Sequence, residues 1–466
     1  MSKNNTLVKN TILLSIGTLI TKGLLFVMVP FFSKWLSTEQ YGKFDLICTY
    51  VSLLIPVIDL AIGEAIFRFS IKEDLINIKR YISNGLALVI FNLFICLIIL
   101  FGVDFVCGIS SIIPFVILLI GELLNNHLRS FLRAIKRLDI YSISSAISVI
   151  FIAILTSLFI LKLNLGLNGI VLGYGLGYIL GNAVIIAKTK YWNYIDMKLV
   201  DFKIVNKLIS YSLPLVPNNI AWWIMNVSDR MILNLFIGPV ANGIYAIANK
   251  VPALCSSVFS MFSISWQQSA VEHVDCKTRD KYFNSVYNNT IGVMISLCAG
   301  LLSINFILFD YIFDLRYNDA KMYVPILVTA ILFSTLSQFF GGIQISFNQT
   351  RENGISTVIG AIINIVINLM FIKNIGVYAA AFSTLISYMT VSAIRYYRMK
   401  SIVRFKMNKF NILISIIYIY FLVSSYITQN LYFNVINLVL ACILFTIINK
   451  NFMITIVNKV YKNKKN

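Results

Sequence analysis

The sequence predicts an all-α integral membrane protein, because its composition and the length of its apolar runs both indicate membrane-spanning helices. The chain has 466 residues, of which 58% are hydrophobic and only 12% are charged. A soluble domain is about 45–50% apolar and about 25% charged. Many apolar runs are long enough to cross a hydrocarbon core of about 30 Å as a helix of about 20 residues. The alternating strands typical of a membrane barrel are absent from the pattern.

The apolar runs predict fourteen membrane spans. The first run is too long for a cleavable signal peptide and lacks a small-residue cleavage site, so it counts as a span. The expected spans are residues 8–32, 41–63, 84–106, 109–128, 140–162, 166–187, 207–237, 240–268, 286–309, 322–346, 354–372, 375–394, 410–428 and 431–449.

The basic residues predict that both termini lie in the cytoplasm. If the N-terminus is inside, most of the 39 Lys and Arg residues fall in the inner segments and few in the outer turns. This asymmetry is what the positive-inside rule requires. The formal net charge of +20 therefore reflects topology and attraction to anionic lipid of the inner leaflet. No nucleic-acid partner is expected.

The chain contains a predicted internal repeat. The stretch STEQYGKFDLI after the first span resembles GPVANGIYAIA after the seventh, which sets Gly42 opposite Gly243. Because each half has an even number of spans, the halves are expected to be parallel repeats with a site between them near the membrane midplane. The expected domains are an N-terminal six-helix bundle at 1–200, a C-terminal six-helix bundle at 201–400, and two further spans with a basic cytoplasmic tail at 401–466.

The motifs of the common enzyme classes are missing from the sequence. There is no GxxxxGK[ST] nucleotide loop, no GxSxG nucleophile motif, and the two His residues are not spaced as a zinc pair. The seven Cys residues show no CxxC spacing and are typical of small core residues. We therefore expect no catalytic residue, metal or cofactor, and the default interpretation is a secondary transporter.

Cations inside the predicted spans are the main candidates for a functional site. At a rise of 1.5 Å per residue, Arg230 lies about 12 Å below the outer turn, Lys250 about 14 Å and Lys22 about 15 Å. All three therefore lie near the middle of the membrane. Charged groups at this depth are costly in lipid and usually face a bundle interior or an aqueous cavity. The pattern favours a cationic cavity.

Two acidic residues accompany these cations. Glu122 lies about 18 Å below the outer end of its span, and we expect it to be a coupling group, with Asp229 as a further charge partner. A purely structural interpretation stands beside this one. Glu122 would then pair with Lys22 or Lys250 to lock helices together. Asp229 and Arg230 would neutralise other groups locally, since adjacent helical residues point about 100° apart.

Aromatic residues and prolines occur near the central charges. Trp222, Trp223 and Tyr245 lie near these charges in the sequence, and the family resemblance given below would make them candidates for sugar contact, because aromatic rings stack on sugar faces. Such residues also serve as packing and interfacial residues in membrane helices. Pro214 and Pro217 are expected to kink the span at 207–237.

The stretch SYSLPLVPNNIAWWIMNVSDRMILNLFIGPVANGIYAIANKVPAL resembles the start of the second half of bacterial polysaccharide flippases, the exporters of O-antigen and capsule repeat units. In that family a Pro-x-x-Pro stretch leads to an Asp-Arg pair, a short turn and Gly-x-Tyr-x-x-Ala. The opening NTILLSIGTLITKGLLFVMVPFFSKWLSTEQYGKFDL is also similar to the family. The matching residues are Pro214, Pro217, Asp229, Arg230, Gly243, Tyr245 and Ala248.

The resemblance implies a fold and a substrate. The family belongs to the multidrug/oligosaccharidyl-lipid/polysaccharide exporter superfamily, which has two six-helix bundles in a V and here two additional C-terminal helices. The implied substrate is an undecaprenyl-diphosphate-linked oligosaccharide, moved from the inner to the outer leaflet by alternating access for O-antigen, lipopolysaccharide or capsule synthesis. Lys22, Arg230 and Lys250 would attract the diphosphate, and Arg suits bidentate phosphate contacts.

The resemblance also implies a location and partners. It places the protein in the bacterial cytoplasmic membrane, surrounded by membrane lipid, with H⁺ or Na⁺ as coupling ion and a polysaccharide polymerase and chain-length regulator as partners. Two other functions remain open. A multidrug or organic-ion antiporter of the same fold would call for an acidic cavity when its substrate is a cation. A membrane polymerase or ligase would call for a long outer loop with catalytic Arg or His.

Overall fold

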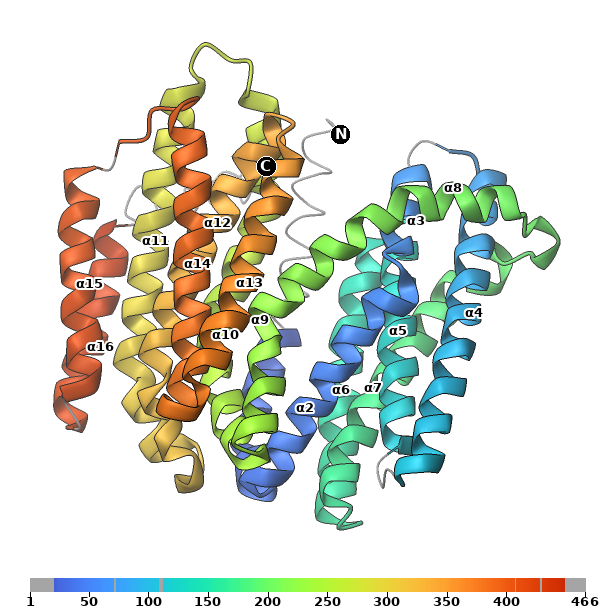
Figure 1. Ribbon diagram of the computed structural model, residues 1–466, viewed down its shortest axis with the longest axis horizontal. Helices are drawn as coiled ribbons and strands as arrows, with labels where there is room; N and C mark the ends of the chain where they lie inside the picture. Colours follow the sequence, from blue (N-terminus) through green and yellow to red (C-terminus); the bar gives the residue numbers. More distant parts are fainter. Residues whose placement is uncertain (1–20, 71–72, 109–111, 407, 428–429, 449–466) are drawn as a thin grey trace, which may run out of the picture. The chain divides into compact units, whose positions relative to one another are not determined.

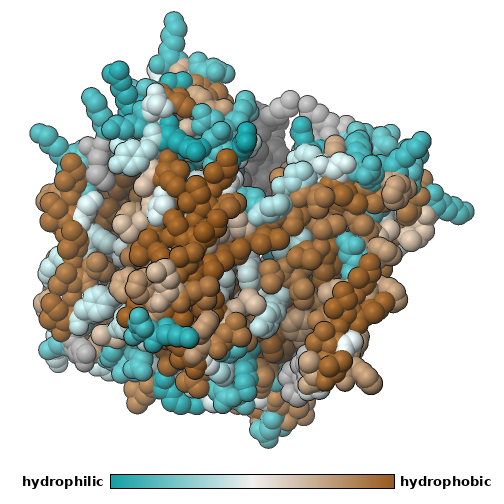
Figure 2. All heavy atoms as spheres, viewed as in Figure 1, coloured by the Kyte–Doolittle hydropathy of each residue, from teal (hydrophilic) through white to brown (hydrophobic). Residues whose placement is uncertain are grey.

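The protein is helical throughout the residues that its computed structural model describes, which are 21–70, 73–108, 112–406, 408–427 and 430–448 (Figure 1). Residues 21–35 form the described part of the first helix. No strand occurs in these ranges. Figure 2 shows apolar side chains along the middle of the helices and hydrophilic side chains at their ends, as expected for helices that cross a membrane.

The remaining helices follow in chain order. In the first half they are α2 (Thr38–Asp59), α3 (Ile62–Ser70), α4 (Leu75–Cys107), α5 (Ile112–Ala134), α6 (Leu138–Leu161), α7 (Gly166–Thr189), α8 (Phe202–Ser212) and α9 (Val216–Phe236). In the second half they are α10 (Pro239–His273), α11 (Arg279–Ile307), α12 (Val324–Ser346), α13 (Thr350–Ile375), α14 (Val377–Lys400), α15 (Lys409–Ile427) and α16 (Leu431–Ile448).

Eleven helices in the described part of the chain are long and apolar enough to cross a membrane. They correspond to eleven of the fourteen predicted spans. The other three predicted spans coincide with the partly described first helix, with α9, and with α15, whose apolar part Asn411–Ile427 is shorter. The all-helical membrane fold is confirmed, and the count of fourteen stays a prediction.

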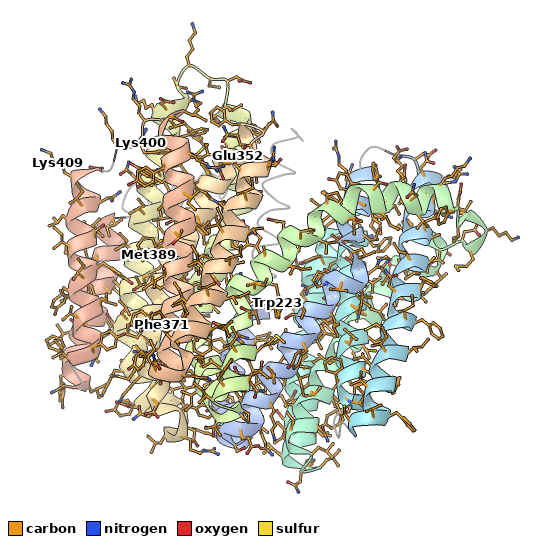
Figure 3. The ribbon with its side chains drawn as sticks, in the orientation of Figure 1. Trp223, Glu352, Phe371, Met389, Lys400 and Lys409 are labelled. Atoms are coloured by element: carbon orange, nitrogen blue, oxygen red, sulfur yellow. The ribbon has the colours of Figure 1, made fainter. Side chains whose placement is uncertain are left out.

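The chain divides into two compact units. The first runs to Asn234 and includes Gly238–Gly243, and the second comprises Leu235–Ile237 and the chain from Ile244 onward. Helices α8 and most of α9 thus belong to the first unit. In the second unit, Glu352, Lys400 and Lys409 lie on three different helices but at the same end of the helix bundle (Figure 3). The predicted domain limits at residues 200 and 400 stay a prediction.

Helix α2 begins and ends at sequence signals of different kinds. Ser37 caps its start: the Ser37 hydroxyl accepts from the backbone N–H of Gln40, and the Gln40 side chain accepts from the N–H of Ser37, both at 3.1 Å. The helix ends at Asp59 because Leu60 and Ala61 adopt positive φ angles of 49° and 55°. The predicted continuous span at 41–63 is therefore wrong at its inner end, where α3 begins as a separate helix.

The predicted span at 207–237 is also divided. A short 3-10 turn, Leu213–Leu215, separates α8 from α9. Pro217 falls in the first turn of α9, where a missing N–H leaves no helical hydrogen bond unmade. The backbone stays in the right-handed helical region through this turn, so the prolines lie where the helix changes from α to 3-10 geometry, and the expected kink stays a prediction.

Two glycines allow a close helix contact in the first unit. A Cβ on Gly42 would overlap the carbonyl oxygen of Pro239, and a Cβ on Gly243 would overlap the carbonyl oxygen of Thr38. The Asn242 side chain adds a hydrogen bond to the Gly42 carbonyl, at 2.8 Å. The predicted repeat sets Thr38 opposite Pro239 and Gly42 opposite Gly243, so the two contacts are equivalent under it. A two-fold relation produces this reciprocity.

Arg395 joins three helices of the second unit. Its side chain is buried, with 1% of the residue exposed. From α14 it donates to the carbonyls of Ser337 on α12 (2.8 Å) and Asn353 on α13 (3.1 Å). It also donates to the hydroxyls of Ser356 (2.9 Å) and Thr357 (2.8 Å) on α13. The predicted span 375–394 ends just before Arg395, which is therefore expected in an inner segment. In the structure α14 continues past Arg395 to Lys400, and the side chain is enclosed between α14, α12 and α13.

We predict that Gly42→Ala and Gly243→Ala each destabilise the protein. The added methyl group must push apart two backbones, and overpacking of this kind costs about 1–3 kcal/mol. The measurement is the melting temperature of the purified protein in detergent. Gly102→Ala on α4 is the control, because a Cβ there meets no atom within 4 Å. An unchanged melting temperature in both test variants would contradict the close contact.

We predict that Arg395→Leu lowers the melting temperature strongly, and that Arg395→Lys restores little of the loss. The leucine removes the charged donors that bridge α12 and α13, and a hydrogen bond to a charged group contributes about 1.5–3 kcal/mol. Lysine keeps the charge but lacks the guanidinium fork that spans two helices. Arg398→Leu, which changes an exposed Arg on the same helix, is the matched control. Equal effects at positions 395 and 398 would count against the bridging role.

Candidate functional site

Arg230 forms an ion pair that links α9 to α2. Its Nη1 lies 3.1 Å from Oδ1 of Asp45. The Asp45 side chain is 4% exposed and the Arg230 side chain 18%. The carboxylate is therefore enclosed, whereas part of the Arg230 side chain is accessible. A charge pair in a low-dielectric interior is expensive to form and more expensive to break, because the remaining partner would be left uncompensated.

Two hydrogen bonds hold the helices on either side of this pair. Near the start of α2, Asn242 donates to the Gly42 carbonyl at 2.8 Å. About two turns beyond Asp45, the indole N–H of Trp223 donates to the Ser52 hydroxyl at 2.9 Å. Trp223 lies on α9 (Figure 3). The ion pair thus lies between two fixed points of an antiparallel α2–α9 seam.

Two other predicted site residues of the first unit, Asp229 on α9 and Lys22 on the first helix, have different surroundings. Asp229 is buried, with 2% exposed, and its Oδ1 accepts from the backbone N–H of Arg230 at 2.9 Å. Lys22 is exposed on the first helix. The Arg230 side chain pairs with the Asp45 carboxylate.

Lys250 and Glu122 lie in different units. Lys250 is half-buried on α10, in the second unit. Glu122 is half-buried on α5, in the first unit. The charge of Arg129, about two turns along the same helix, acts on the Glu122 carboxyl. The convergence of Lys22, Arg230 and Lys250 stays a prediction.

The three predicted sugar-contact residues differ in accessibility. Trp222 and Trp223 are half-buried on α9. Tyr245 has no exposed surface, so its ring is packing in this conformation and is not available to a sugar.

A family model described as "Polysaccharide biosynthesis protein" matches residues 7–266, which is more than half of the chain. This chain belongs to that family. All eight predicted site residues lie within the matched range: Lys22, Glu122, Trp222, Trp223, Asp229, Arg230, Tyr245 and Lys250.

Two curated proteins are similar over most of their lengths. One is described as the probable low-salt glycan biosynthesis flippase Agl15 of Haloferax volcanii, 23% identical over 414 residues, covering 86% of this chain and 85% of that protein. The other is the uncharacterized membrane protein MJ1375 of Methanocaldococcus jannaschii, 22% identical over 408 residues, covering 83% of this chain and 96% of that protein.

Solved transporter structures share the fold. Lipid II flippase MurJ in an inward closed conformation gives a TM-score of 0.69 at 18% identity, covering 96% of this chain and 100% of that chain. An inward-facing multidrug resistance MATE family transporter of the MOP superfamily gives 0.65 at 12% identity, covering 82% and 94%. Family and fold are those of transporters rather than enzymes, and the predicted membership of a polysaccharide flippase family is confirmed.

The sequence analysis missed Asp45, although a signal for it was present. Asp45 lies within the predicted span 41–63, and an ionisable residue inside a span is the criterion that selected Arg230. What the sequence lacked was the pairing, because 185 residues separate the two partners. Arg230 therefore has a carboxylate neighbour that the cationic-cavity hypothesis did not include.

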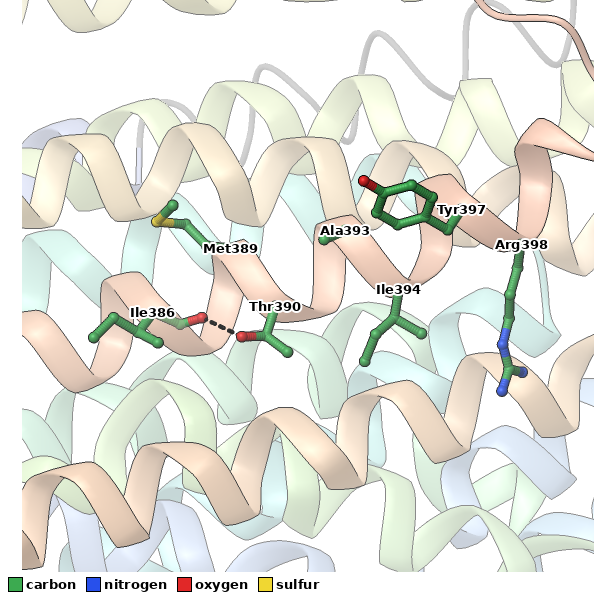
Figure 4. A pocket seen from close by; sticks show the side chains of 7 residues that line it. All are labelled: Ile386, Met389, Thr390, Ala393, Ile394, Tyr397 and Arg398. Carbon is green, nitrogen blue, oxygen red and sulfur yellow. Dashed lines mark hydrogen bonds between the residues drawn. The ribbon is translucent and has the colours of Figure 1, made fainter.

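An apolar groove on the second unit contains none of the predicted site residues. It is lined along α14 by Ile386, Met389, Thr390, Ala393, Ile394, Tyr397 and Arg398 (Figure 4). The hydroxyl of Thr390 donates to the carbonyl of Ile386, so its polarity is used within the helix. The apolar lining is that of a helix face turned toward lipid.

Proposed function

We propose that this protein moves a lipid-linked oligosaccharide, carried on undecaprenyl diphosphate, from the inner to the outer leaflet of the bacterial cytoplasmic membrane. It does so by alternating access, with both termini in the cytoplasm, and delivers repeat units for O-antigen, capsule or a related surface polysaccharide. A polysaccharide polymerase and a chain-length regulator then receive the product. The lipid tail stays in the membrane throughout.

The observation that carries this proposal is the partly accessible Arg230 side chain, which pairs with Asp45 of the apolar, membrane-length helix α2 within the family region. An arginine in such a place is expensive and is usually retained for a substrate or ion. Its guanidinium presents several N–H donors in a planar fork that matches phosphate oxygens. The half-buried Lys250 and the exposed Lys22 supply two further cations for the second phosphate group.

The comparisons support a lipid-linked glycan as substrate. The curated relative from Haloferax volcanii is described as a glycan biosynthesis flippase, and the MurJ structure is that of a lipid II flippase. The family description names polysaccharide biosynthesis. A lipid-linked glycan has an anionic head group, so it fits both these descriptions and a cationic site.

A multidrug or organic-ion antiporter is the second candidate, because MATE transporters share the fold. A cationic drug requires carboxylates that face an accessible cavity. In the first unit the Asp45 and Asp229 carboxyls are buried, while Arg230 keeps an accessible side chain. The charge arrangement therefore favours an anionic substrate.

We predict that Arg230→Ala, Lys250→Ala and Lys22→Ala each reduce surface polysaccharide, with Arg230→Ala reducing it most, by about tenfold or more, since loss of a buried charged contact costs about 2–5 kcal/mol. The measurement is complementation of a deletion strain, with polymer detected by immunoblotting and protein level measured in the membrane fraction. Lipid-linked repeat units accumulate in the same strains.

The control for these variants is Lys43→Ala. Lys43 lies on α2 near Asp45, but it is exposed and pairs with Glu39 at 2.7 Å, so surface polysaccharide should be unchanged. Normal polymer in all three test variants, at normal protein level, would refute the diphosphate site. Export of ethidium that depends on Arg230 would instead favour the multidrug function.

We also propose that Glu122 couples transport to H⁺ or Na⁺. It is a half-buried carboxyl on α5, with the Arg129 charge and the Tyr178 phenol beside it, so its protonation changes the charge balance inside the first unit. We predict that Glu122→Gln abolishes the dependence of transport on an imposed ion gradient in proteoliposomes. Glu64→Gln, at a half-exposed carboxyl paired with Arg133, is the control and should retain the dependence. Unchanged gradient dependence in Glu122→Gln would refute this role.

A further inference from the structure

The two side chains of the Asp45–Arg230 ion pair differ in solvent-accessible surface. Asp45 is almost enclosed at 4% exposed, and Arg230 retains 18% of its side-chain surface. Arg230 is therefore the more accessible partner of the pair, although its Nε is buried. Asp45 lies behind it, bonded through Oδ1 at 3.1 Å. Its second oxygen, Oδ2, is buried and has no hydrogen-bond partner among the described residues.

The seam around the pair keeps this geometry in place. The Trp223–Ser52 bond on one side and the Asn242–Gly42 bond on the other fix α9 and α10 against α2. The glycine contact prevents α2 from shifting sideways, since the backbones already touch. Asp45 therefore cannot move away from Arg230 unless the seam opens.

A second anion at Arg230 must share the cation with Asp45. The guanidinium attracts the diphosphate, while the Asp45 carboxylate repels it through a poorly screened interior. A transporter needs both effects, because its substrate must bind strongly enough to enter and weakly enough to leave. A buried carboxylate that is fixed behind the binding cation weakens substrate binding at all times.

We propose that Asp45 is an internal competitor for Arg230 that lowers the affinity of the site for a diphosphate and so permits release of the substrate. Asp45 is a positioning residue, since it acts through Arg230 and touches no substrate. The inference rests on the proposed function, because Arg230 must be a diphosphate ligand for the competition to matter. It goes beyond that function by assigning the carboxylate an effect opposite in sign to that of the cations.

The test measures binding and transport separately in the full-length protein. Binding is measured in detergent with farnesyl diphosphate, a soluble isoprenoid diphosphate, by titration calorimetry. Transport is measured by complementation of surface polysaccharide, and folding by the melting temperature without ligand. The variants are Asp45→Asn, Arg230→Gln and the double variant, with Glu64→Gln as a control that removes one negative charge from another ion pair of the first unit.

Asp45→Asn should bind farnesyl diphosphate about tenfold more tightly than the native protein, and it should nevertheless yield less surface polysaccharide. Arg230→Gln should bind about tenfold more weakly. In the double variant the effect of Asp45→Asn should shrink to about twofold or less, because the residue through which it acts is gone. Glu64→Gln should change neither binding nor polymer.

A purely structural ion pair gives a different result. Asp45→Asn would then weaken binding or leave it unchanged while the melting temperature falls, and that outcome overturns the inference. If Arg230→Gln weakens binding but Asp45→Asn does not strengthen it, the inference fails and the proposed function stands. If Arg230→Gln leaves binding and polymer unchanged, the proposed diphosphate site itself is refuted.

A second variant keeps the test decisive if Asp45→Asn does not accumulate in the membrane. Asp45→Ser also removes the negative charge and retains a hydroxyl that can accept from Arg230. It carries the same expectation of tighter farnesyl diphosphate binding and lower export. Weaker binding in Asp45→Ser, at a normal melting temperature, would overturn the inference equally.

Discussion

The hydrocarbon core of a membrane cannot solvate a charge, so each ionic group inside it must obtain its stabilisation from the protein. Two arginines of this chain illustrate different solutions. Arg395 is enclosed and donates to carbonyl and hydroxyl oxygens on two neighbouring helices. Arg230 pairs with a single buried carboxylate and keeps part of its side chain accessible. The first arrangement joins helices, and the second leaves a cation that a ligand can reach.

The second recurring constraint is the distance between helix backbones. Helices in lipid associate through close packing and hydrogen bonds rather than through the hydrophobic effect, so small residues determine where they touch. Gly42 and Gly243 provide such a contact in the first unit, with carbonyl oxygens in the places that a Cβ would occupy. Arg230 on α9 and Asp45 on α2 are held by this seam. This contact lies between α2 and the start of α10, about one turn from the place where the Asp45–Arg230 pair links α2 to α9.

Transport places opposing demands on a site of this kind. A cation deep in the membrane binds an anionic head group strongly, and strong binding alone would retain the substrate. In our proposal, a fixed carboxylate behind the cation lowers that affinity without adding a moving part. The carboxylate would act through Arg230, whose side chain is the more exposed of the two.

The sequence by itself determined the membrane class, the positions of most spans and the family. Those features are local: apolar run length, helix rise and loop charge can all be read within a few residues of one another. It did not predict that Asp45 pairs with Arg230, that Tyr245 is enclosed, or that Arg395 lies inside a helix bundle. It also joined α2 to α3 and α8 to α9, because apolar runs continue across both breaks. The tertiary structure decided these points. The pairing of residues that are 185 positions apart and the burial of an aromatic ring both depend on which helix faces meet. Hydropathy along the chain does not specify which faces these are.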